Sequence, residues 1–132
     1  MKILIIEDEF LIAEGVSLTL QSAGHEVTGI AEDLPTALAL AGQEKPDMAF
    51  VDIKLANGSN GLDVARALKA MGIACVFATG NPPNKAQAGG AGLGYIAKPF
   101  SPRVLVQTAA FVAGLLSPCA PSAVAPNGFI TL

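Results

Sequence analysis

Short apolar runs alternate along this chain with longer segments in which apolar residues recur at helical spacing. The runs cover residues 3–6, 27–30, 48–51, 73–78 and 95–97. Between the first two runs, Ile12, Val16 and Leu20 share one helical face, and similar stripes occur farther along the chain. Strands separated by helices in this way are typical of a parallel sheet that is covered on both faces. The sequence therefore predicts an α/β fold with a doubly wound, five-stranded parallel sheet.

Capping residues and glycines mark the ends of the predicted helices. Ser101 followed by Pro102 is typical of a helix start, and so is Asp33 with Pro35 in the first turn. The fourth helix has the weakest signals, because four glycines lie between positions 89 and 94 and each costs up to about 1 kcal/mol relative to alanine. We expect this fourth helix to be short, weak or mobile.

The length and the end of the last helical stripe predict the domain organisation. The chain has 132 residues, enough for one domain with a real hydrophobic core. Residues 117–132 contain three prolines and no charged side chain. We therefore expect residues 1–116 to form the domain and residues 117–132 to be a flexible, proline-rich tail.

The composition excludes several classes of protein. A net charge of −3 argues against non-specific binding of nucleic acid, which needs a basic face. No segment reaches the roughly 18 apolar residues of a membrane span, and acids at positions 7–9 follow the first apolar run, unlike a signal peptide. Two cysteines in different surroundings do not make a disulfide scaffold. We expect a cytoplasmic protein without nucleic-acid or membrane partners.

Polar side chains follow four of the five predicted strands. Glu7 and Asp8 follow the first strand, Asp52 follows the third, Thr79 ends the fourth and Lys98 follows the fifth. Ligands of open parallel sheets bind outside the carboxyl ends of the strands. These side chains are therefore expected to converge at one edge of the sheet.

Such a group of side chains favours a particular chemistry. Glu7, Asp8 and Asp52 would repel one another, and a divalent cation with hard oxygen ligands, such as Mg²⁺, removes that conflict. A metal and Lys98 around a carboxylate also make a receptor for a phosphoryl group. Asp52 can then act as the nucleophile, since carboxylates form acyl phosphates.

The residues named above match a known family. Over residues 1 to about 116, the sequence resembles the receiver domain of two-component response regulators. The matching motifs, in chain order, are Glu7–Asp8, Asp52, Thr79 within FATG, Tyr95 at the aromatic switch position, and Lys98–Pro99–Phe100. FATG also resembles a subgroup of alphaproteobacterial receivers, many of them stand-alone. Where that subgroup has a tyrosine soon after FATG, this chain has Asn81–Pro82–Pro83, and the interval from Thr79 to Lys98 is short.

The resemblance implies a flavodoxin-like sheet in the order 2-1-3-4-5 and a set of roles at its edge. Asp8 and Asp52 would bind Mg²⁺ directly, Glu7 through water, and Lys54 through its backbone carbonyl. The phosphoryl group would come to Asp52 from a phosphohistidine on a sensor histidine kinase or a histidine phosphotransfer protein. The remaining implied contacts are a hydrogen bond from Thr79 to the phosphoryl group, inward rotation of Tyr95 behind it, and a contact from Lys98 to the phosphate.

The predicted function is a phosphoacceptor module of a phosphorelay that is not itself an enzyme and that signals to an unknown downstream protein by protein–protein contact. Lys54 and Asn81 flank the predicted pocket, and we expect them to tune the lifetime of the acyl phosphate. One alternative is a pseudo-receiver that binds a partner without phosphorylation. Another is an aspartyl-phosphate phosphatase resembling haloacid dehalogenases, which need a second acid where this chain has Lys54. Taken alone, Asp52 could also serve to cap the following loop. Tyr95 could likewise serve only to pack against its neighbours.

Overall fold

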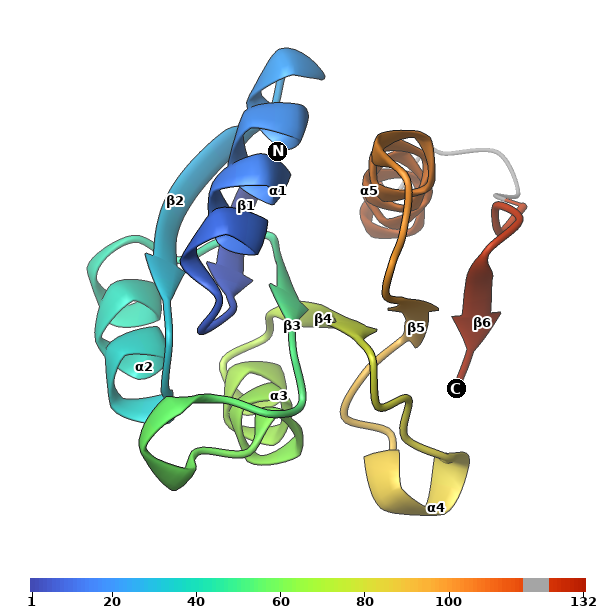
Figure 1. Ribbon diagram of the computed structural model, residues 1–132. Coiled ribbons are helices and arrows are strands. Elements are labelled where there is room, and N and C mark those ends of the chain that lie inside the picture. Colours follow the sequence, from blue (N-terminus) through green and yellow to red (C-terminus); the bar gives the residue numbers. More distant parts are fainter. Residues whose placement is uncertain (118–123) are drawn as a thin grey trace.

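The computed structural model describes residues 1–117 and 124–132, and its centre is one mostly parallel sheet (Figure 1). The sheet has six strands in the order β2-β1-β3-β4-β5-β6, with β1 to β5 parallel and β6 antiparallel to β5. The strands are β1 (Lys2–Ile6), β2 (Glu26–Ala31), β3 (Met48–Val51), β4 (Ala74–Thr79), β5 (Gly94–Ala97) and β6 (Phe129–Thr131). The predicted α/β class and the predicted order of the first five strands are confirmed.

Helices cover both faces of the sheet, as a doubly wound fold requires (Figure 1). They are α1 (Phe10–Ser22), α2 (Leu34–Gln43), α3 (Gly61–Ala70), α4 (Lys85–Ala88) and α5 (Pro102–Leu116), with a short 3-10 turn η1 (Ala56–Gly58). Buried residues of α1 and α5 form one core cluster with one face of the strands. Those of α2, α3 and α4 form the other cluster on the opposite face. All four residues of β3 are buried, because this strand lies between both layers.

The local signals in the sequence explain where two of the helices begin. The Asp33 side chain accepts a hydrogen bond from the Thr36 backbone N–H at the start of α2 (3.0 Å), which satisfies one free donor of the first turn. Ser101 does the same for the Val104 N–H at the start of α5 (3.2 Å). Both predicted caps are confirmed.

The fourth helix is short, as predicted. It has four residues, is capped by Asn84, and ends at Gly89, whose φ of 56° lies in the left-handed region that glycine tolerates. The glycines that follow therefore end the helix and lead into β5. Within the described ranges, no helix is long and apolar enough to cross a membrane.

The end of the chain differs from the prediction. The expectation of five strands and of a tail outside the domain is wrong for residues 129–131, which form β6 on the outer edge of β5. The reason is that Phe129 buries its side chain in the core cluster of α1 and α5, and tertiary burial outweighs the proline-rich context. The part of the predicted tail at residues 118–123 lies outside the described residues.

Candidate functional site

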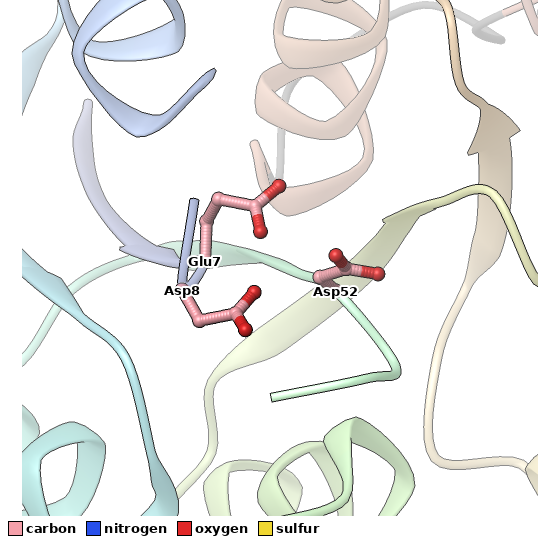
Figure 2. A group of neighbouring side chains, drawn as sticks. All are labelled: Glu7, Asp8 and Asp52. Atoms are coloured by element: carbon pink, nitrogen blue, oxygen red, sulfur yellow. The ribbon is translucent and has the colours of Figure 1, made fainter. Parts of the chain in front are cut away.

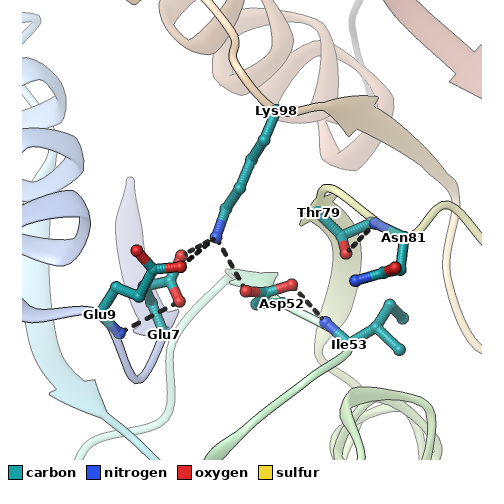
Figure 3. Close-up of polar contacts among 7 residues, drawn as sticks. All are labelled: Glu7, Glu9, Asp52, Ile53, Thr79, Asn81 and Lys98. Carbon is teal, nitrogen blue, oxygen red and sulfur yellow. Dashed lines mark hydrogen bonds and ion pairs between the residues drawn. The ribbon is translucent and has the colours of Figure 1, made fainter.

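The carboxyl ends of four parallel strands meet at one edge of the sheet. The register aligns Ile6 of β1 with Val51 of β3, and Thr79 of β4 with Ala97 of β5. The next residues along β1, β3 and β5 therefore come together at the same level. They include Glu7, Asp52 and Lys98, and Thr79 lies beside them at the end of β4 (Figure 3).

Lys98 is the centre of this group. Its Nζ donates a hydrogen bond to Asp52 Oδ2 at 2.8 Å and forms an ion pair with Glu7 Oε1 (Figure 3). A third carboxylate, that of Glu9, has its Oε1 3.9 Å from Lys98 Nζ and is largely exposed. The side chains of Lys98, Asp52 and Glu7 are 17%, 8% and 6% exposed. One ammonium group thus faces two nearly buried carboxylates, so the site keeps an excess of negative charge when both acids are ionised.

Asp52 is held in place by its neighbours at both carboxylate oxygens. Oδ1 accepts a hydrogen bond from the backbone N–H of Ile53 at 2.7 Å, and Oδ2 accepts the bond from Lys98. Burial by itself raises the pKa of Asp52, but hydrogen bonding from Lys98 and Thr79 and the lysine charge outweigh it, so the pKa lies below the usual value. Asp52 is therefore an ionised carboxylate with a fixed orientation.

Glu7 has the opposite electrostatic behaviour. Burial, together with the negative charge of Asp52, raises the pKa of Glu7 from 4.5 to about 7, although the hydrogen bond from Lys98 acts against the shift. For Lys98, burial acts to lower the pKa, yet hydrogen bonds to Asp52 and Glu7 raise it above its usual value. Without a further cation, one lysine does not fully compensate the two acids.

Three carboxylates from the ends of β1 and β3 form an acidic cluster. Glu7, Asp8 and Asp52 each offer one oxygen, and these oxygens lie within 4.8 Å of one another. Figure 2 shows the three side chains together, with Asp8 from the loop after β1 beside Asp52. Glu7 and Asp52 are buried, whereas Asp8 is exposed and open to solvent. The donor set consists of hard, anionic oxygen atoms, which fits a divalent cation of the Mg²⁺ type.

Thr79 and Asn81 lie on the other side of Asp52. Thr79 is fully buried, and its Oγ1 accepts a hydrogen bond from the Asn81 backbone N–H at 3.0 Å (Figure 3). This bond fixes the turn after β4 and keeps the hydroxyl at the edge of the site. The sequence predicts that Lys54 and Asn81 flank the pocket, and of these two Asn81 lies in the turn beside Thr79 (Figure 3).

Lys54 and Tyr95 lie outside the hydrogen-bonded group around Lys98. Lys54 is exposed in the loop after Asp52, and its backbone pairs with that of Asn60. Tyr95 is half-buried in the middle of β5 and packs against the core cluster of α2 and α3. Its implied switch role stays a prediction, as does the implied role of the Lys54 carbonyl.

Gly61 is a residue of the site that the sequence analysis missed. It is the first residue of α3, and a Cβ at this position would lie only 1.9 Å from the backbone oxygen of Asp52. Its N–H donates to the Ile53 carbonyl at 2.7 Å. Only glycine allows α3 to start this close to the residue that follows β3. The Asn60–Gly61 pair before an amphipathic segment was the available signal, since Asn60 caps the helix.

Asp33 is a second missed residue, because it was considered only as a helix cap. Its Oδ2 accepts a hydrogen bond from the Asn57 side chain at 2.9 Å, while Oδ1 caps α2. Asn57 has a φ of 58°, which places it in the left-handed region within η1. The Ser59 hydroxyl also accepts the Leu34 N–H at 3.0 Å. These bonds tie the loop after Asp52 to the start of α2 and so fix its course.

Comparison with known proteins agrees with this geometry. Residues 3–110 match the family described as the response regulator receiver domain. The phyllosphere-induced regulator PhyR of Methylorubrum extorquens is 40% identical over 83 residues, which are 61% of this chain and 31% of that protein. The chain covers about half of the length of other curated relatives that it matches.

Two solved structures of PhyR proteins have the same fold. The receiver domain of PhyR from Erythrobacter litoralis, solved by NMR, aligns with a TM-score of 0.77 at 29% identity and covers 93% of this chain and 95% of that one. A crystal structure of PhyR from Bartonella quintana, described as an anti-anti-sigma factor, aligns with a TM-score of 0.64 at 31% identity, over 80% and 45% of the two chains. The family match, together with the acids and the lysine at the carboxyl edge of the sheet, shows that this chain belongs to the response regulator receiver domain family of two-component systems.

Proposed function

We propose that this receiver domain is a phosphoacceptor that takes a phosphoryl group on Asp52 from a phosphohistidine of a sensor histidine kinase or a histidine phosphotransfer protein. The observation that carries the proposal is the position of the Lys98 ammonium, 2.8 Å from Asp52 Oδ2 and paired with Glu7. A carboxylate that is ionised, oriented and next to a lysine has the properties of an activated nucleophile.

The transfer forms one bond and breaks one. A carboxylate oxygen of Asp52 attacks phosphorus, and the bond between phosphorus and the histidine nitrogen of the donor breaks. The electron pair of that bond stays on the imidazole, which takes up a proton. The Lys98 ammonium neutralises charge on the transferring oxygens, so the chain accepts the group without acting as an enzyme that turns over a substrate.

The residues at this edge fit a magnesium ion, because three hard carboxylate oxygens lie within 4.8 Å of one another and carry more negative charge than Lys98 compensates. Asp8 and Asp52 would hold the ion directly and Glu7 through water, with the Lys54 carbonyl as a further ligand. When bound, the ion supplies positive charge to the acids and to the phosphoryl oxygens.

The remaining residues of the site act after transfer in this proposal. The Thr79 hydroxyl gives its hydrogen bond to a phosphoryl oxygen, and Tyr95 turns inward behind it. Lys54 and Asn81 limit the access of water to the acyl phosphate and so set its lifetime. In this proposal the protein has two conformations. Phosphorylation shifts the population between them only because the phosphoryl group makes different contacts in each conformation.

The PhyR relatives suggest the kind of pathway in which the signal is used. The Bartonella quintana PhyR is described as an anti-anti-sigma factor. We extend the proposal to a downstream protein that takes part in the control of a sigma factor, reached by protein–protein contact.

Chemical phosphorylation tests the proposal. The protein is incubated with Mg²⁺ and acetyl phosphate, and intact mass spectrometry is used to look for one added phosphoryl group. Asp52→Asn should abolish the modification, whereas Asp63→Asn, which changes an exposed acid of α3, should leave it unchanged. An unmodified wild-type protein, or equal labelling of the Asp52→Asn variant, would favour the pseudo-receiver alternative and refute the assignment.

A further inference from the structure

The outer edge of β5 is occupied by a strand from the C-terminal segment (Figure 1). β6 runs antiparallel to β5 with Ile96 opposite Phe129, Tyr95 opposite Ile130 and Gly94 opposite Thr131. The pairing continues through the Leu132 N–H, which donates to the Leu93 carbonyl at 3.1 Å. Without β6, this side of β5 would present its free N–H and C=O groups, which readily accept an added strand.

The edge is shaped for a strand with an aromatic side chain. At Gly94, a Cβ would lie 2.3 Å from the Ile130 carbonyl oxygen and 2.4 Å from Phe129 Cζ, so only glycine lets the strand approach. The Phe129 side chain is 7% exposed, and its ring lies 5.3 Å from that of Phe111 on α5, tilted by 59°. The Phe129 ring thus packs against Phe111 and occupies space that a side chain at position 94 would fill.

β6 itself is a short strand with a single buried side chain, and the half-buried Leu132 beyond it packs against the core cluster of α2, α3 and α4. It has three residues, and of these only Phe129 is buried, whereas Ile130 and Thr131 are exposed. Short pairings at a sheet edge gain little beyond the ordering entropy that they cost. A strand of this kind can exchange with another segment that offers the same contacts.

We propose that the outer edge of β5 is a strand-binding surface for an extended segment of a partner protein that presents an aromatic side chain at the position of Phe129. β6 is the resident occupant of this surface and competes with the partner. β5 leads directly into Lys98, whose backbone N–H donates to the Thr79 carbonyl at 3.0 Å. Only the length of this short strand therefore separates the strand-binding surface from the acidic site. The inference concerns strand binding and does not depend on phosphorylation of Asp52.

A peptide with the sequence of residues 124–132, VAPNGFITL, is the probe, and its binding to the full chain is measured by fluorescence anisotropy. Phe129→Ala in the protein removes the anchor of the resident strand. Because the competing strand is weakened, this variant should bind the peptide at least tenfold more tightly than the wild type does. Val124→Ala, at a side chain that is 87% exposed, is the matched control and should bind like the wild type.

Two further variants separate this surface from non-specific binding. Gly94→Val in the protein should abolish binding, since its side chain fills the space of the strand. A peptide in which Phe129 is replaced by alanine should also fail to bind. Native-state hydrogen exchange of the wild type gives a measurement that needs no destabilised variant, and the amides of β6 should exchange faster than those of β3.

Several outcomes would overturn the proposal. Equal peptide affinity for the wild type, Phe129→Ala and Gly94→Val would show that the edge is not the binding surface, and so would absence of binding to a folded Phe129→Ala variant. β6 amides as well protected as those of β3 would show that the strand is not displaceable. A wild-type dimer that Phe129→Ala converts to monomer would assign the edge to a second copy of this chain and refute the partner assignment.

Discussion

The buried carboxylate of Glu7 predicts that the metal-free protein loses stability between pH 5 and pH 8. The folded structure raises the pKa of Glu7 from 4.5 to about 7, so the native state binds this proton more tightly than the unfolded chain does. The resulting stabilisation is complete below pH 4.5 and is lost as the pH rises through 7. The difference between the folded and unfolded pKa of Glu7 corresponds to about 3 kcal/mol of unfolding free energy.

Glu7→Gln keeps the shape of the side chain and removes its charge. In EDTA at pH 8, we expect the variant to be more stable than the wild type by about 3 kcal/mol, and at pH 5 by less than about 1 kcal/mol. The low pKa of Asp52 does not interfere with this comparison. The stability that ionised Asp52 contributes is complete above pH 3.8, the ordinary pKa of the group, and stays constant between pH 5 and pH 8. Urea denaturation at several pH values, followed by circular dichroism, measures the difference.

Magnesium should reduce the stability advantage of Glu7→Gln over the wild type. A ligand that binds only the native state stabilises it more the more tightly it binds, and the wild type has the extra acid. With saturating Mg²⁺ at pH 8, the free energy of unfolding of the wild type should therefore rise more than that of Glu7→Gln. Glu32→Gln, at an exposed acid, is the control for the loss of one negative charge. A Glu7→Gln variant that is less stable than the wild type at pH 8 in EDTA, or whose gain is equal at pH 5 and pH 8, would refute the reasoning.

Three further substitutions test how the site is held together, and urea denaturation measures each of them. Gly61→Ala should destabilise the protein by at least about 2 kcal/mol, because its methyl group meets the Asp52 carbonyl, whereas Gly15→Ala in α1 meets nothing and should stabilise by up to about 1 kcal/mol. A neutral result at position 61 would contradict the close approach. Asp33→Ala should cost about 1–2 kcal/mol through the lost cap, and Asp33→Asn should recover part of it. Lys98→Met should destabilise the metal-free protein by about 3 kcal/mol at pH 8 and much less at pH 5, and equal losses would argue against the ion pairs.

The sequence by itself was sufficient for most of the architecture. Hydrophobic periodicity is a local property, so the first five strands and the helices between them could be recognised from spacing alone. Side-chain caps are local as well, which is why Asp33 and Ser101 marked the starts of α2 and α5. The convergence of Glu7, Asp52 and Lys98 followed from a general rule, since the carboxyl ends of neighbouring parallel strands share one edge.

Other features depend on contacts between distant segments and were decided only by the tertiary structure. β6 forms because Gly94 leaves room for a neighbouring backbone and Phe111 offers a surface to Phe129, and neither property is visible in a segment that looks like a tail. The need for glycine at position 61 arises from the backbone of Asp52, which the fold brings next to it. The proton affinity of Glu7 likewise depends on burial beside Asp52 and Lys98. Pattern and spacing identify which residues gather at the site, but the distance and dielectric between them exist only once the chain has packed.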